Sequence, residues 1–170
     1  ARVEDWDLWR RAARHFPLSN VSRWLLDYRI HADRMSCVHE AEQRREGLRV
    51  QGHELAALGL EDHPLRGVHA DVSHGSLDCA ERDEHFVADV VAWFETLREA
   101  NASRSVFASR AMDAVLADRL LLVLNANRHL RRQVLRTLSA ATWVRRAQPL
   151  GSLALLLKTP LPLPASGAAS

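Results

Sequence analysis

The amino-acid sequence predicts an all-α protein, and three observations carry this prediction. Apolar residues recur at steps of three and four in four separate segments, as they do along one face of an α-helix. Gly and Pro are sparse before the C-terminal tail, which argues against the many turns of an all-β chain. The 170 residues are enough to bury one full core. We therefore expect a single domain over residues 1–158, built as a four-helix bundle with a long first crossover loop.

The first third of the chain is expected to contain an arm, one long helix and the start of that crossover. Residues 1–17 carry three large aromatic side chains and end at Pro17, so they form either a short helix or a docked extension. An apolar stripe predicts the first helix from about Ser19 to Glu46. Residues 47–77 are rich in Gly and are expected to cross over the bundle, or else to include a short helix near residues 53–60.

Three further helices are expected in the rest of the chain. Their predicted ranges are 77–100, 105–124 and 127–147. The third helix is apolar nearly all round in its second half, which predicts a central position. Pro149 and Gly151 should end the fourth helix, and a last apolar stretch covers residues 153–157. Residues 159–170 are expected to be disordered.

The sequence contains no pattern that is typical of catalysis. Gly-rich phosphate loops, G-x-S-x-G and C-x-x-C are absent. His63, His69 and His74 lie close together, but in a Gly-containing segment where a solvated loop is favoured over a zinc site. We therefore expect no catalytic, cofactor-binding or metal-binding residues. The net charge of +2 and the short apolar runs predict neither nucleic-acid binding nor membrane insertion.

Several features suit a secreted protein. The chain starts at Ala1 without an initiator Met, so either a leader has been removed or the piece was cut for expression. Asn20 and Asn101 each begin an Asn-X-Ser triplet, the acceptor pattern for N-glycosylation. Cys37 and Cys79 are expected to form one disulfide; two buried thiols, or a bond to a partner chain, are the alternatives.

The fourth predicted helix has one apolar and one basic face. Leu130, Val134 and Leu138 share the apolar face, which leaves Arg132, Arg136 and Trp143 on the opposite side. An exposed Trp flanked by Arg is typical of a binding hot spot. The alternative is that residues 153–157 cover Trp143.

Residues of three predicted helices resemble the long-chain helical cytokines of the interleukin-6 family, a group that includes the interleukin-12 alpha subunits and ciliary neurotrophic factor. The segments are 23–27 with Cys37 ten residues later, 77–82 with 93–95, and 134–139 with 143–145. The last of these is similar to the family's final helix. One feature departs from the family, because only residues 125–127 separate the third and fourth predicted helices, too few to span a bundle.

The resemblance implies a secreted, non-enzymatic signalling protein. Its partners would be class I cytokine receptor chains, or a soluble receptor-like beta subunit. One receptor face would comprise Arg132, Arg136, Trp143, Arg145 and Arg146, and a second Arg29, Asp33, Arg110 and Asp113. The alternative function is an intracellular helical adaptor or regulatory module that binds through the same arginine-rich face.

Overall fold

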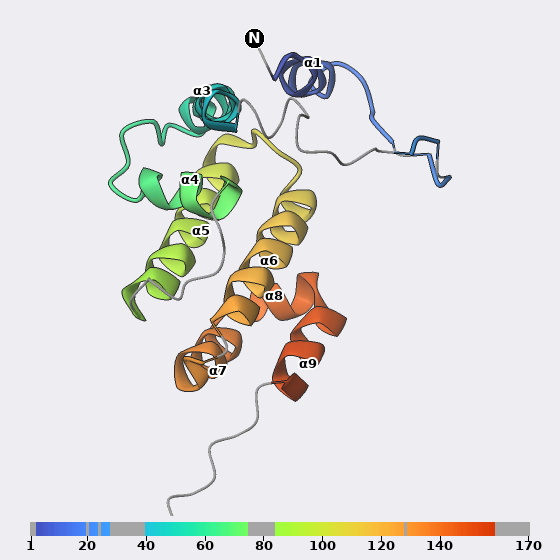
Figure 1. Cartoon of the computed structure of the whole chain (residues 1–170). Helices are drawn as coiled ribbons and strands as arrows, with labels where there is room; N and C mark the ends of the chain where they lie inside the picture. Colours follow the sequence, from blue (N-terminus) through green and yellow to red (C-terminus); the bar gives the residue numbers. More distant parts are fainter. Residues whose placement is uncertain are drawn as a thin grey trace, which may run out of the picture. The chain divides into compact units, whose positions relative to one another are not determined.

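The computed structural model describes residues 3–19, 21–23, 25–27, 40–74, 84–127 and 129–158. Every regular element in these ranges is an α-helix (Figure 1), so the all-α prediction is confirmed. The chain groups into two compact units, Ala1–Ala57 and Leu58–Ser170, each of which is described by itself. The single domain expected over residues 1–158 stays a prediction. No helix in the described ranges has both the length and the apolar content that crossing a bilayer requires.

The first unit contains α1 (Glu4–Ala12) and α3 (Glu40–Ala57), which contact each other. The helix predicted from Ser19 is wrong at its start, because residues 21–23 and 25–27 are not helical. The predicted end at Glu46 is wrong as well, since α3 continues through Gly47 and Gly52. Burial of Val50 and Leu55 stabilises this extension, and such packing outweighs the roughly 1 kcal/mol that each helical Gly costs.

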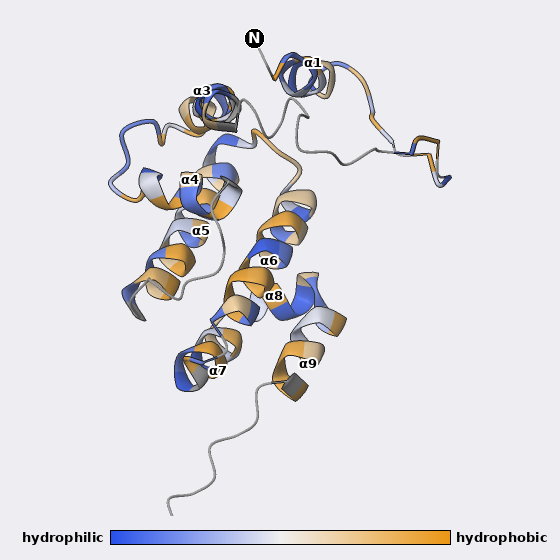
Figure 2. Cartoon of the chain, viewed as in Figure 1, coloured by the Kyte–Doolittle hydropathy of each residue, from blue (hydrophilic) through white to orange (hydrophobic). Residues whose placement is uncertain are grey.

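The first three helices of the second unit are α4 (Arg66–His74), α5 (Glu84–Arg104) and α6 (Ser109–Ala126). Hydrophobic residues occur along α5 and α6 (Figure 2), and the two helices pack on each other. The fully buried large side chains of these helices are Trp93, Phe94, Leu120, Leu124, Val87, Val90 and Val123. The turn predicted at residues 101–104 is wrong by one helical turn, because α5 runs through Arg104 and the chain reverses at 105–108.

The predicted fourth helix is divided into α7 (Arg131–Ala140) and α8 (Thr142–Ala147). The division falls at Ala141, whose φ of −77° and ψ of 70° are not helical. The predicted end near Ala147 is confirmed, since α8 ends there, but a further helix, α9 (Pro149–Lys158), begins at Pro149. Proline is well tolerated at the first position of a helix, where its missing N–H has no intrahelical partner. The break at Ala141 sets the direction of every side chain in α8.

Candidate binding surface

Trp143, predicted to be an exposed hot spot, is buried in the second unit and only 7% exposed. Its indole Nε1 donates a 2.6 Å hydrogen bond to Oε1 of Glu95 on α5. The Arg98 guanidinium lies 4.5 Å from the centre of the Trp143 ring. The prediction of exposure is wrong because it assumed one continuous helix, and the break at Ala141 changes the helical phase before residue 143. Trp143 therefore belongs to the core of this unit and offers no ring for a partner.

Arg98 connects α5, α6 and α8 through Trp143 and two carboxylates. Its Nη1 lies 2.7 Å from Oε2 of Glu95, and its Nε lies 2.7 Å from Oδ1 of Asp113. Partial burial alone would lower the pKa of Arg98, but the hydrogen bonds to Asp113 and Glu95 raise it above its ordinary value. Asp113 was predicted to contact a receptor, yet its carboxylate is already engaged inside the protein.

The structure describes only part of the second predicted receptor face. Arg110 is exposed near the start of α6. Arg29 and Asp33 lie outside the described residues. The second receptor face therefore stays a prediction.

Four exposed arginines remain from the first predicted receptor face, and we call them the arginine face. They are Arg132 and Arg136 on α7 and Arg145 and Arg146 on α8. Arg132 and Arg136 are four residues apart and thus share one side of α7. Within the described residues none of the four forms an ion pair with a carboxylate. Their charge is therefore available to a partner.

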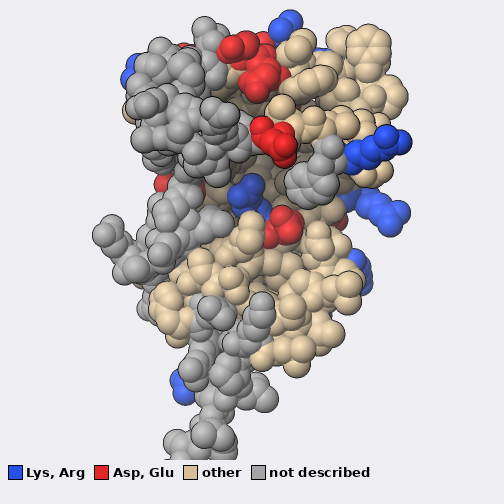
Figure 3. Space-filling view, turned by 45° about the vertical axis from the view of Figure 1, so that its right-hand side comes forward, with Lys and Arg blue, Asp and Glu red and all other residues tan. Residues whose placement is uncertain are grey.

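The arginine face lies in a part of the chain that contains no acidic residue. All 21 Asp and Glu residues precede residue 119. The basic residues from that point onward are Arg119, Arg128, Arg131, Arg132, Arg136, Arg145, Arg146 and Lys158. On the face drawn in Figure 3, the lower end of the second unit accordingly shows basic but no acidic side chains. The net charge of +2 conceals this separation of acidic and basic residues along the sequence. The positions of the acidic residues could have indicated it without a structure.

Asn101 was predicted to carry a glycan, but its side chain is buried at the reversal between α5 and α6. Its Oδ1 accepts a 2.8 Å hydrogen bond from the backbone N–H of Phe107, and its Nδ2 donates a 3.0 Å bond to the carbonyl of Phe107. Nδ2 is the atom to which an N-linked glycan would be attached. The folded chain therefore uses Asn101 to close a turn and does not present it for modification. Asn20, Cys37 and Cys79 lie outside the described residues.

Two histidines of the predicted loop, His63 and His69, pack around a buried tryptophan. The rings of His63 and His69 lie 5.4 and 5.9 Å from that of Trp93, measured between centroids. Trp93 Nε1 donates a 3.3 Å hydrogen bond to Nδ1 of His69, and Leu65 N donates to Nδ1 of His63. Among the described residues no three potential metal ligands come together. These contacts give both histidines a packing role at the junction of α4 and α5.

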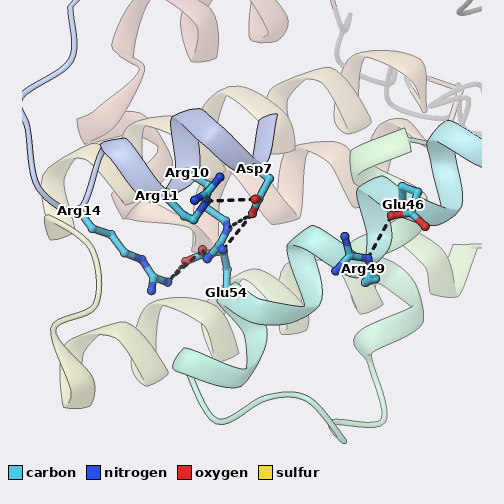
Figure 4. A network of polar contacts seen from close by, with 7 residues as sticks. All are labelled: Asp7, Arg10, Arg11, Arg14, Glu46, Arg49 and Glu54. Atoms are coloured by element: carbon cyan, nitrogen blue, oxygen red, sulfur yellow. Dashed lines mark hydrogen bonds and ion pairs between the residues drawn. The ribbon is translucent and has the colours of Figure 1, made fainter. Parts of the chain in front are cut away.

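In the first unit, ion pairs attach the charged side of α1 to α3 (Figure 4). Arg10 and Arg14 both reach Oε1 of Glu54, at 3.0 and 3.1 Å, and Arg10 also binds Asp7. The hydrogen bond from Arg10 lowers the pKa of Asp7, and the bond to Glu54 is the main cause of a raised pKa at Arg10. The apolar side of α1 is exposed instead, with Trp9 at 57%.

No family model matches the chain, and neither the curated proteins nor the solved structures include a significantly similar one. These comparisons thus identify no interleukin-6 family member, and the resemblance in the sequence stays a prediction.

Proposed function

We propose that this chain is a helical binding protein that docks its arginine face onto an acidic surface of a partner protein. The observation that carries the proposal is the set of four exposed arginines that have no carboxylate partner among the described residues. They belong to the sequence segment 119–170, which contains no Asp or Glu. Arginine suits such a role, because its planar guanidinium forms bidentate hydrogen bonds to carboxylates. Electrostatic complementarity of this kind increases the association rate and favours one orientation of the partner.

The specific form that we propose is a secreted helical cytokine or cytokine alpha subunit that binds class I cytokine receptor chains. The helical content and the resemblance of residues 93–95, 134–139 and 143–145 support it. A four-helix bundle of the long-chain type and a Cys37–Cys79 disulfide belong to this proposal. The alternative is an intracellular adaptor that uses the same face, for which free thiols and an unmodified Asn20 would be expected in the natural protein.

The proposal is tested by binding the purified chain to a panel of class I cytokine receptor ectodomains, using surface plasmon resonance at two salt concentrations. We expect at least one ectodomain to bind, with an affinity that falls as salt rises. The variant Arg132→Glu/Arg136→Glu should weaken that binding by about thirtyfold or more, because each reversal replaces an attraction by a repulsion.

The matched control is Arg23→Glu/Arg45→Glu, which changes the net charge by the same amount at two exposed arginines of the other unit. This variant should bind like the wild type. Equal loss in both variants would show that only net charge matters, and normal binding by the double variant would refute the role of α7. If no ectodomain binds, the cytokine form is wrong and the adaptor takes its place.

A further inference from the structure

The outward side of α9 is apolar along the whole helix. Leu150, Leu153 and Leu157 are 80%, 53% and 78% exposed, and Ala154 is exposed between them. Steps of three and four place these residues on one side of a helix. We call Leu150, Leu153 and Leu157 the leucine row. Single exposed leucines are ordinary at protein surfaces, but a continuous row on a short helix indicates a binding surface.

The opposite side of α9 is packed, so the leucine row faces outward for a structural reason. Ser152 and Leu155 are 3% and 4% exposed, and α9 contacts both α6 and α8. Gly151 lies so close to α6 that an added Cβ would come within 2.8 Å of Cδ1 of Leu121. Rotating α9 to hide its leucines would break this close approach and expose Leu155.

The charged residues that precede and follow the leucine row in the sequence, from residue 119 onward, are all basic. Arg145 and Arg146 are exposed near the end of α8, four and three residues before α9 begins at Pro149. No carboxylate side chain follows Asp118. Helices bind a membrane surface by combining two kinds of residue. Leucines enter the acyl region, and nearby cations reach the phosphate oxygens of the lipids.

We propose that the leucine row, together with Arg145 and Arg146, binds the surface of a bilayer that contains anionic phospholipids. The contact is peripheral, since α9 has only 10 residues and a span needs about 20. The net charge of +2 predicted no membrane partner, because it averages over charges that are separated along the chain. This proposal is independent of the protein partner proposed above, and its test contains no protein partner.

The test is co-sedimentation of the full chain with large vesicles of phosphatidylcholine, with or without phosphatidylserine. We expect binding to the vesicles that contain phosphatidylserine, weaker binding to pure phosphatidylcholine, and a decrease with added salt. Leu150→Ser/Leu157→Ser should reduce the partition coefficient by about tenfold or more, because two leucines no longer enter the bilayer. Arg145→Gln/Arg146→Gln should reduce both the binding and its dependence on salt.

The matched control is Leu8→Ser/Val115→Ser, which alters two apolar side chains that are 51% and 66% exposed elsewhere on the chain. Its partition coefficient should equal that of the wild type. Absence of wild-type binding, or unchanged binding of both the leucine and the arginine variants, would overturn the proposal. A wild-type dimer that the leucine variant converts to monomers in analytical ultracentrifugation would also overturn it, because a second copy would then cover the row.

Discussion

Replacing Trp143 by Ala should destabilise the protein strongly. A Trp side chain buries about 150–250 Å², which at about 25 cal/mol/Å² contributes roughly 4–6 kcal/mol. Trp143 is 7% exposed, and its Nε1 also binds Glu95. The expected loss is therefore about 3–5 kcal/mol of unfolding free energy, in line with Trp truncations in other cores. At about 2–4 °C per kcal/mol for a chain of this size, Tm should fall by roughly 6–20 °C.

A second variant separates the ring from its hydrogen bond. Trp143→Phe keeps an aromatic ring beneath Arg98 but removes the Nε1 donor to Glu95. It should cost only about 1–2 kcal/mol, because the Glu95 side chain is 39% exposed and keeps its bond to Arg98.

The control for both variants is Trp9→Ala, a truncation of an exposed ring that should change stability by less than about 0.5 kcal/mol. All variants would be compared by thermal unfolding, followed by far-UV circular dichroism. A Trp143→Ala protein that melts like Trp9→Ala would refute the placement of Trp143 in the core and the break at Ala141.

Other substitutions test further contacts. Gly59→Ala should destabilise the protein by about 1–2 kcal/mol in urea unfolding, because Gly59 has a φ of +68°, in the left-handed region that disfavours a Cβ. Its control is Gly67→Ala in α4, which should be neutral or stabilising because nothing lies within 4 Å of the added Cβ. Asn101→Ala should cost about 1–3 kcal/mol in the same assay, since it leaves the N–H and carbonyl of Phe107 without partners; an unchanged urea midpoint would contradict this role. The lowered pKa of Asp7 contributes stability that is present above the unfolded-state pKa of about 3.9 and is lost as pH falls through the folded value. The Asp7→Asn variant should therefore lose less stability than the wild type during an acid titration below about pH 4, followed by circular dichroism. Identical titrations of the two proteins would show that Asp7 contributes nothing to the pH dependence of stability.

The sequence predicted the fold class and the long apolar helices, because α5 and α6 carry their own periodic signal. It misplaced the helix ends, since these depend on contacts that single-sequence patterns do not contain. Gly47 and Gly52 were expected to end a helix, but α3 continues through them. Pro149 was expected to stop a helix, and α8 does end at Ala147. Nothing in the sequence indicated that Pro149 also begins α9, where proline is tolerated at the first helical position.

The candidate site was predicted in part. Arg132 and Arg136 on α7 are exposed, as the helical pattern of the sequence indicated, and so are Arg145 and Arg146 on α8, which the resemblance implied. Trp143 was placed on the same face because no residue near Ala141 signals a break in the helix. Ala is the best helix former, so we attribute the irregular backbone at Ala141 to tertiary packing. The engagement of Asp113 by Arg98 joins residues 15 apart on two helices and leaves no local trace in the sequence.

The most direct test of the arginine face is hydrogen–deuterium exchange of the chain alone and in complex with a receptor ectodomain that binds it. We predict slower exchange on binding for backbone amides of residues 131–147, with no change in α3. Exchange that slows in α1 or α3 while residues 131–147 stay unchanged would contradict the proposal that this face docks onto the partner.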